Sequence, residues 1–262
     1  MKLNENYGDR IFCHEMADEM HRLTLISNAY DFISQRQISA LITQPGTRCL
    51  DIGSGTGSIA EWLSMQPNVQ EVVALDRFVH LLERRLTVSQ RLQIVQHDLN
   101  DDDYYGEFDL IHIRFVLMHL RNREDLLKKI SKWLKPGGWL VVSDSIHISL
   151  QEIDDPLFQK VMSTMWQALI NSIGSDEYWS HELQSQFQSL GLKNISVEAY
   201  LPSVGKGTPM AEFWCLTWQA MRDRMLETGD LDDKTLKAAE KRLMQEGMIA
   251  LSSGMMTCIG QK

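Results

Sequence analysis

The stretch LDIGSGTGS, residues 50–58, lies between a β-forming run and a helical stretch. Glycines at such a turn let the backbone bend sharply and approach a ligand without a Cβ in the way. A dinucleotide-binding turn has the pattern GxGxxG, with Gly or Ala at position 58, but this chain has Ser58 there and its third glycine one residue earlier. Asp51, before the first glycine, is poorly placed beside a pyrophosphate and well placed near an ammonium group. The turn therefore favours a ligand with a cationic group.

On both sides of this turn, short runs rich in Val, Ile and Leu alternate with helical stretches. The runs lack strict alternation, as expected for strands covered on both faces, and they occupy residues 48–52, 71–76, 92–98, 108–114 and 139–145. Helices are expected at 57–65, 78–89 and 123–134, and the Lys-Pro-Gly-Gly sequence at 135–138 ends the last of them. This rhythm predicts an α/β fold with a doubly wound parallel sheet.

The flanking regions are expected to be mainly helical. Before the first strand, Phe12, Met16, Met20 and Leu23 recur at helical spacing. After residue 145, Asp-Pro and Thr-Pro pairs are typical helix starts. The elements expected there are helices from 156, over 180–190, from 209 and over 233–246, and strands over 194–201 and 255–260.

Two acidic residues end the second and third expected strands. Asp76 stands about 20 residues past the turn, where a carboxylate accepts hydrogen bonds from both ribose hydroxyls. Asp98 is placed to accept from an exocyclic amine such as that of adenine. Either residue could instead cap the following helix, which is the commonest use of Asp at such a turn. We favour the ligand for Asp76 and leave both interpretations open for Asp98.

Five segments, in order, resemble the motifs of class I S-adenosylmethionine-dependent methyltransferases, and most closely a small-molecule, natural-product subgroup. They are LDIGSGTGSIAEWL (50–63), VVALD (72–76), HDL (97–99), FDLIHIRFVLMHL (108–120) and LKPGGWLVVSD (134–144). The ordered set is specific, although each motif alone is not. The resemblance implies a Rossmann-like, doubly wound, seven-stranded mixed sheet with an antiparallel last strand and helical cap additions.

The resemblance also implies a division of the chain into regions, and it implies S-adenosylmethionine as the cofactor. We expect a single methyltransferase domain, 1–262, made of an N-terminal helical lid (1–45), a cofactor-binding core (46–145) and helical cap insertions with the last two strands (146–262).

Cofactor contacts carry over residue by residue. Gly53, Ser54 and Gly55 would line the methionine part, next to Asp51 of the same motif. Asp76 would bind the ribose.

The remaining contacts surround the adenine and the sulfonium. Arg77 would lie beside the adenine, and Asp98 and Leu99 would frame it through a carboxylate and a backbone amide. Arg114 and Phe115 would lie beside the sulfonium. Arg22, in the upstream segment EMHRL (19–23), would reach the cofactor carboxylate or be a solvated helix-face arginine.

Methyl transfer from a sulfonium depends mainly on alignment, which supplies about 7–11 kcal/mol of a barrier. A base is needed only when the nucleophile loses a proton. The catalytic candidates at the carboxyl edge of the sheet are His119, Asp144 and His147, although the residue at the position of His119 is usually a packing and hydrogen-bonding residue in the family that the sequence resembles. His112, inside a strand, is expected to be structural. No Asp-Asn pair follows Asp144, so no metal is expected.

Composition and charge limit the kinds of partner that the protein is expected to bind. The net charge is −9 and no Lys/Arg stripe occurs, which argues against nucleic acid. No run approaches the ~18 apolar residues of a membrane span, and the polar start has no signal-peptide core. Four scattered cysteines are expected to be reduced thiols. We therefore expect a cytoplasmic protein without a membrane partner, and the sequence carries no signal for an oligomeric state.

Methionine and tryptophan are dense in the expected cap. Most should be core, and several should line an adaptable apolar pocket; they are Met162, Met165, Trp166, Trp179, Met210, Trp214, Trp218 and Met221. The sequence thus predicts S-adenosylmethionine-dependent methyl transfer to an oxygen, nitrogen or carbon of a hydrophobic small molecule. The alternative is a protein of this fold that binds the cofactor but catalyses a non-methylating cyclisation or rearrangement, or acts as a binding partner.

Overall fold

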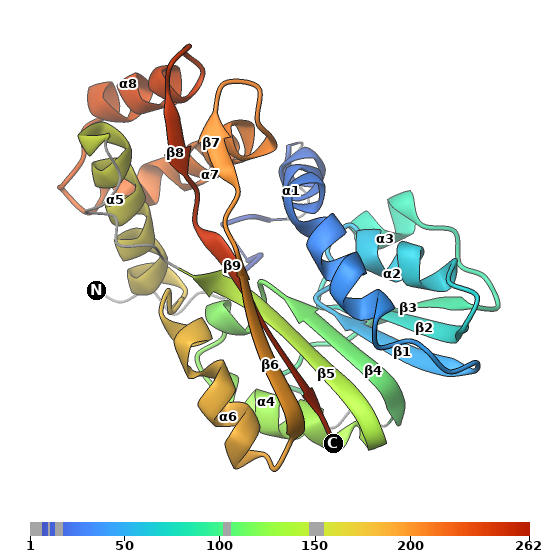
Figure 1. Ribbon diagram of the computed structural model, residues 1–262. Coiled ribbons are helices and arrows are strands. Elements are labelled where there is room, and N and C mark those ends of the chain that lie inside the picture. Colours follow the sequence, from blue (N-terminus) through green and yellow to red (C-terminus); the bar gives the residue numbers. More distant parts are fainter. Residues whose placement is uncertain (1–6, 10, 14–17, 102–105, 147–154) are drawn as a thin grey trace.

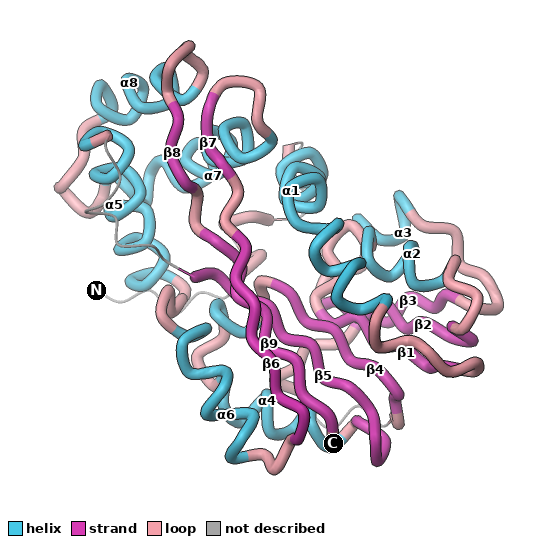
Figure 2. The backbone as a smooth tube through the Cα atoms, viewed as in Figure 1, coloured by secondary structure: helices cyan, strands magenta, loops and turns pink. Residues whose placement is uncertain are grey.

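A computed structural model describes residues 7–9, 11–13, 18–101, 106–146 and 155–262. Its centre is a seven-stranded sheet in the order β3-β2-β1-β4-β5-β9-β6 (Figure 1, Figure 2). The strands are β1 (Thr47–Ile52), β2 (Val69–Asp76), β3 (Leu92–Gln96), β4 (Phe108–Arg114), β5 (Leu134–Ile146), β6 (Lys193–Tyr200) and β9 (Gly254–Gln261). β9 pairs antiparallel with β5 and β6, and the pairs among β1 to β5 are parallel. The predicted mixed sheet with an antiparallel last strand is confirmed.

Helices cover both faces of this sheet. They are α1 (Glu19–Ser39), α2 (Ser58–Ser64) and α3 (His80–Arg85) on one face, and α4 (Arg123–Lys132) and α6 (Leu183–Ser189) on the other (Figure 1). Adjacent strand residues separate into two hydrophobic clusters, because successive side chains point to opposite faces. Cys49 packs with Ile38 and Leu63 of the first group, whereas Leu50 belongs to the cluster that contains Leu127 of α4.

A cap stands beyond the carboxyl ends of the parallel strands. It comprises α5 (Pro156–Ser172), α7 (Pro209–Leu226), α8 (Asp233–Leu243) and a two-stranded antiparallel sheet of β7 (Ser203–Gly205) and β8 (Ile249–Leu251) (Figure 1). The predicted starts of α5 and α7 are confirmed, because the side chains of Asp155 and Thr208 accept from the amides of Phe158 and Ala211. The larger hydrophobic cluster runs from the sheet into this cap.

Two local expectations were wrong, and one feature was not expected. The helix before the first strand begins at Glu19, whereas Phe12 lies outside it with a left-handed φ of +58°. Residues 135–138 do not separate helix from strand but lie within β5, which takes up the Pro-Gly-Gly through a shift in register against β4. The short β7 and β8 were not expected, because three residues carry no periodic signal.

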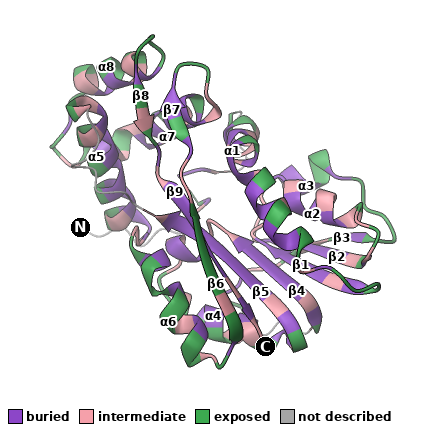
Figure 3. Cartoon of the chain, viewed as in Figure 1, coloured by how far each residue is buried: buried purple, intermediate pink, exposed green. Residues whose placement is uncertain are grey.

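The burial of each strand depends on whether helices cover it. Helices cover β4 and β5 on both sides, while β6 at the edge exposes most of its residues (Figure 3). The carboxyl ends of β1, β2, β4 and β5 meet beneath the cap. In open α/β sheets ligands bind at this edge.

Candidate active site

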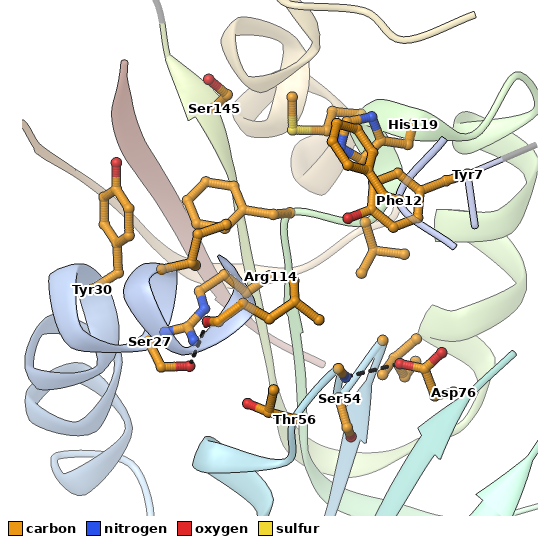
Figure 4. A pocket seen from close by; sticks show the side chains of 18 of the residues that line it. Tyr7, Phe12, Ser27, Tyr30, Ser54, Thr56, Asp76, Arg114, His119 and Ser145 are labelled. Atoms are coloured by element: carbon orange, nitrogen blue, oxygen red, sulfur yellow. Dashed lines mark hydrogen bonds between the residues drawn. The ribbon is translucent and has the colours of Figure 1, made fainter. Parts of the chain in front are cut away.

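A cavity of about 250 Å³ lies between the carboxyl ends of the strands and the cap (Figure 4). The part beside the glycine turn is called the turn half here and is lined by 51–56, 76–78 and 97–100. The part beneath the helices is called the cap chamber; its wall includes Arg22, Ile26, Tyr30, Arg114, Phe115, His119, Ser145, Met165, Trp166, Met210, Phe213 and Trp214. The two parts form one continuous cavity.

The turn after β1 requires glycine at its first position. Gly53 and Gly55 have φ values of +66° and +57°, a region that side chains with a Cβ rarely adopt. A Cβ on Gly53 would also lie only 2.2 Å from Cγ2 of Val116. Ser54 closes the turn by donating its hydroxyl to the carbonyl of Asp51 at 2.8 Å. The backbone of this turn is thus exposed to the cavity at a position where no side chain fits.

Asp51 lies at the floor of the turn half and is almost fully buried. Nδ1–H of His112 donates to its Oδ1 at 2.7 Å, the one hydrogen bond that this carboxylate makes within the described residues. His112 therefore orients Asp51 from the neighbouring strand, and the second carboxylate oxygen remains available to a cationic group. The expected structural role of His112 is thus to hold the Asp51 carboxylate in place.

Asp76 ends β2 directly opposite the glycine turn (Figure 4). Its Oδ2 accepts from the amide of Gly55 at 2.8 Å, and its Oδ1 accepts from the amide of Phe78 at 3.1 Å. These two bonds fix the orientation of the carboxylate beside the turn.

Arg77 and Asp98 meet on the wall of the turn half. Nε of Arg77 lies 3.0 Å from Oδ2 of Asp98, and its Nη1 lies 2.9 Å from Oδ1 of Asp9. Asp98 also accepts from the amide of Asn100 at 2.9 Å, so it caps a turn as well as lining the cavity. Leu99, mostly buried, adjoins it.

The end of β4 connects the turn half to the cap chamber. Arg114 is paired with Asp31 of α1, Nη2 to Oδ1 at 2.7 Å. Phe115 has a left-handed φ of +56°, a conformation that costs free energy and is held here by a hydrogen bond from its amide to the Ser143 carbonyl. Its ring packs edge-on against Tyr30, with centroids 5.1 Å apart.

Arg22 lies on the cavity wall in a ring of partners. Its Nε and Nη2 donate to the two carboxylate oxygens of Glu19 at 2.8 and 2.7 Å, and Nη2 also donates to the hydroxyl of Tyr7 at 2.7 Å. Its guanidinium stacks 4.0 Å from the Phe12 ring centroid. The structure therefore does not place Arg22 on a solvated helix face.

His119 faces the cap chamber from the turn after β4 (Figure 4). Its Nδ1 is hydrogen-bonded to Oγ of Ser175 at 2.8 Å, and its ring lies 4.8 Å from that of Tyr7. Burial, together with the cations of Arg22 and Arg123, lowers the pKa of His119 to about 3. The imidazole is therefore neutral near pH 7.

The structure does not place either of the other two catalytic candidates, Asp144 and His147, at the cavity. Asp144 is fully buried and does not line the cavity; it faces the backbone of Val116 and Met118 and the indole of Trp179. Burial raises the pKa of Asp144 to about 8. His147 lies outside the described residues. His119 is thus the one predicted catalytic residue that the structure places at the cavity.

Several residues of the site were not predicted from the sequence. Tyr7, Phe12 and Tyr30 enter the cavity from the N-terminal segment and α1, and Ser175 orients His119 from the loop after α5. Of the cap methionines and tryptophans, four line the cavity: Met165, Trp166, Met210 and Trp214. The others are buried in the core: Met162, Trp179, Trp218 and Met221.

The family of this chain follows from a comparison with protein-family models. A methyltransferase domain matches residues 10–197, which is most of the chain. The chain belongs to the methyltransferase family. S-adenosylmethionine is the cofactor of this methyltransferase domain, and solved members of the fold contain its demethylated product.

Individual relatives show how far the likeness reaches. Methyltransferase str3 from Strobilurus tenacellus is 36% identical over 117 residues, 43% of this chain and 40% of that protein. The chain thus matches about two fifths of that relative's length. The YcgJ protein from Bacillus subtilis has the same fold, with a TM-score of 0.57 and 15% identity over 87% of this chain and 96% of that one.

A third similar structure carries ligands. Phosphoethanolamine N-methyltransferase 2 from Haemonchus contortus was solved with phosphomonomethylethanolamine and S-adenosylhomocysteine. Its TM-score is 0.52 and its identity 16%, covering 92% of this chain and 52% of that one. At this identity the likeness concerns the fold.

The turn half fits the cofactor of this methyltransferase domain. Gly53 and Gly55 would let the methionine part approach the backbone, the open oxygen of Asp51 would face its ammonium group, and Asp76 would accept from the ribose. Across the described ranges no group of three His, Cys, Asp or Glu side chains could hold a metal ion. No helix in those ranges has the length and apolarity to cross a bilayer.

Proposed function

We propose that this chain transfers a methyl group from S-adenosylmethionine to an oxygen, nitrogen or carbon atom of an apolar small molecule held in the cap chamber. The observation that carries the proposal is the continuity of the cavity from the glycine turn to the cap helices. S-adenosylmethionine supplies, when bound, an electrophilic methyl group on a positively charged sulfur. The chain's own contribution is to hold and orient the two reactants.

The apolar walls of the cap chamber support an apolar acceptor. Met165 and Trp166 reach the cavity from α5, and Met210 and Trp214 reach it from α7. Methionine side chains adapt to irregular shapes, and apolar walls with a few polar groups are usual for small-molecule sites. The cap helices would also exclude water from the reacting atoms.

His119 is assigned an orienting role at the acceptor. Its neutral ring can accept a hydrogen bond from the nucleophile's O–H or N–H, and Ser175 holds the ring in place. A pKa of about 3 makes His119 a weak base, so it would not remove the proton before the new bond forms. Acceptors that need no prior deprotonation fit this site best.

Product analysis tests the proposal. The protein is incubated with S-adenosylmethionine and a small-molecule extract of its source cells, and mass spectrometry follows S-adenosylhomocysteine and any compound that gains one methyl group. We expect both to appear, and the His119→Gln variant to yield less methylated product while binding S-adenosylhomocysteine normally. Cofactor binding without any methylated product would contradict transfer and favour a binding role. Phosphoethanolamine is added separately as the charged acceptor suggested by the Haemonchus structure.

A further inference from the structure

The cationic side chains on the wall of the cap chamber are already neutralised. Arg22 forms a two-pronged ion pair with Glu19, and their side chains are only 4% and 2% exposed. Such bidentate pairs are among the strongest charge-assisted hydrogen bonds. Glu19 itself is not part of the cavity wall, so it compensates Arg22 from behind.

Arg114 is likewise paired with a carboxylate of α1. Its partner Asp31 lies 2.7 Å away, with side chains 10% and 19% exposed. Two further titratable groups line the chamber. His119 is neutral near pH 7, and burial raises the pKa of Tyr30 well above its usual range, so its phenol is neutral as well. Within the described part of the chain, the chamber therefore presents no uncompensated charge to a ligand.

The same chamber is rich in aromatic rings from separate elements. Tyr30 comes from α1, Phe115 from the end of β4, Trp166 from α5, and Phe213 and Trp214 from α7. Phe213 and Trp214 pack at 64° with centroids 4.8 Å apart. Aromatic side chains interact favourably with other rings by offset or edge-to-face contacts. Such walls suit a planar ring system better than a flexible chain.

We propose that the cap chamber selects an uncharged, planar aromatic acceptor, and that Glu19 sets this selectivity by neutralising Arg22. The inference rests on the proposed function for its acceptor role and extends it to a substrate class. A carboxylate or phosphate would have to leave water for a chamber without a free cation, which is strongly unfavourable. A neutral phenol loses little solvation and keeps its hydroxyl near His119.

A matched pair of probes tests this selection. 2-Naphthol and 2-naphthoate share a ring system but differ in charge at pH 7, and each is titrated by calorimetry into protein saturated with S-adenosylhomocysteine. We expect 2-naphthol to bind at least about tenfold more tightly than 2-naphthoate, a difference of about 1.4 kcal/mol. Phosphoethanolamine, titrated in the same way, should give no saturable heat.

Glu19→Gln tests the origin of the selectivity. The substitution leaves Arg22 without its counter-charge, so the affinity for 2-naphthoate should rise at least about tenfold while that for 2-naphthol changes little. Glu212→Gln is the matched control, because it removes a carboxylate charge from the solvent-exposed contact with His21, on the outside of the same α1–α7 contact. Asp31→Asn, which frees Arg114, provides a second variant with the same expected direction if Glu19→Gln does not fold.

The outcomes separate this inference from the proposed function. Equal binding of the two naphthalenes by the unmodified protein, or binding of neither, would overturn the selection of neutral aromatics. Unchanged naphthoate affinity in a folded Glu19→Gln variant would overturn the role of Glu19. Failure to bind S-adenosylhomocysteine, seen in the first titration before any probe is added, would instead refute the cofactor site on which the proposed function depends.

Discussion

Asp76 is the residue whose removal tests cofactor binding most directly. Both of its oxygens are held by backbone amides of the turn half, so the carboxylate is preoriented for ribose hydroxyls. We expect Asp76→Ala to weaken the binding of S-adenosylhomocysteine by roughly 1.5–3 kcal/mol, the range for a hydrogen bond to a charged group. Titration calorimetry measures the change, with Asp223→Ala as control because that side chain is 89% exposed. Unchanged affinity in the folded Asp76 variant would refute ribose recognition by this residue.

Asp144 makes stability depend on pH. Burial raises its pKa from 3.8 to about 8, so the native state binds more protons than the unfolded state between these values. Stability contributed by the protonated carboxyl is therefore present below the unfolded pKa and is lost as the pH rises through the folded one, with a slope of at most about 1.4 kcal/mol per pH unit.

Asp144→Asn should remove this loss, because an amide does not ionise. The free energy of unfolding of the variant, minus that of the unmodified protein, should be larger at about pH 8.5 than at about pH 6.5. Urea denaturation at the two pH values measures this difference. The opposite contribution of His119, whose pKa falls from 6.5 to about 3, acts below this window. Asp223→Asn serves as the exposed control. A stability difference that is the same at both pH values would show that Asp144 is already ionised in the native protein and that its pKa is not raised.

At the scale of elements, α7 presents one face to the cavity and another to the core. Trp214 lines the cap chamber and donates its indole N–H to Ser252 at 2.8 Å. Trp218, one turn later, is fully buried and packs near Phe158 of α5. The two tryptophans therefore separate binding from stability on the same helix.

Alanine substitutions on α7 should show this division. Trp214→Ala should weaken 2-naphthol binding about tenfold and leave the affinity for S-adenosylhomocysteine unchanged. Trp218→Ala should lower the free energy of unfolding by about 3–5 kcal/mol, as for other large core truncations, with probe affinity retained in the folded fraction. Calorimetry and urea denaturation measure the two quantities. Equal effects of the two substitutions on probe binding would contradict the assigned faces.

At the scale of the whole molecule, sheet and cap should unfold together. The larger hydrophobic cluster continues from the sheet into α5, α7 and α8, so neither part keeps its core without the other. We expect one thermal transition, the same by near- and far-ultraviolet circular dichroism. Saturation with S-adenosylhomocysteine at a hundred times its dissociation constant should add about 2.7 kcal/mol to the stability of this single unit. Two transitions, only one of them shifted by the ligand, would show that the cap is a separate domain.

Local sequence patterns were sufficient to predict the sheet and the turn half. Hydrophobic runs, the glycine turn and the Asp-Pro and Thr-Pro helix starts are local patterns, and the elements that they predict are present, although β5 begins earlier than expected. Residues at the carboxyl ends of β1 and β2, such as Asp51 and Asp76, also reach the cavity, because the ends of parallel strands meet at one edge. Local pattern and topology are sufficient for such positions.

Which side chains act together depends on how separate elements pack. Asp144 and Ser145 are neighbours at the end of β5, yet only Ser145 reaches the cavity, because successive strand residues point to opposite faces. The pairing of His119 with Ser175 joins residues 56 positions apart. Arg22 meets Thr217 of α7 across 195 positions. Such contacts arise when separate elements pack, and a short-range sequence pattern does not contain that information.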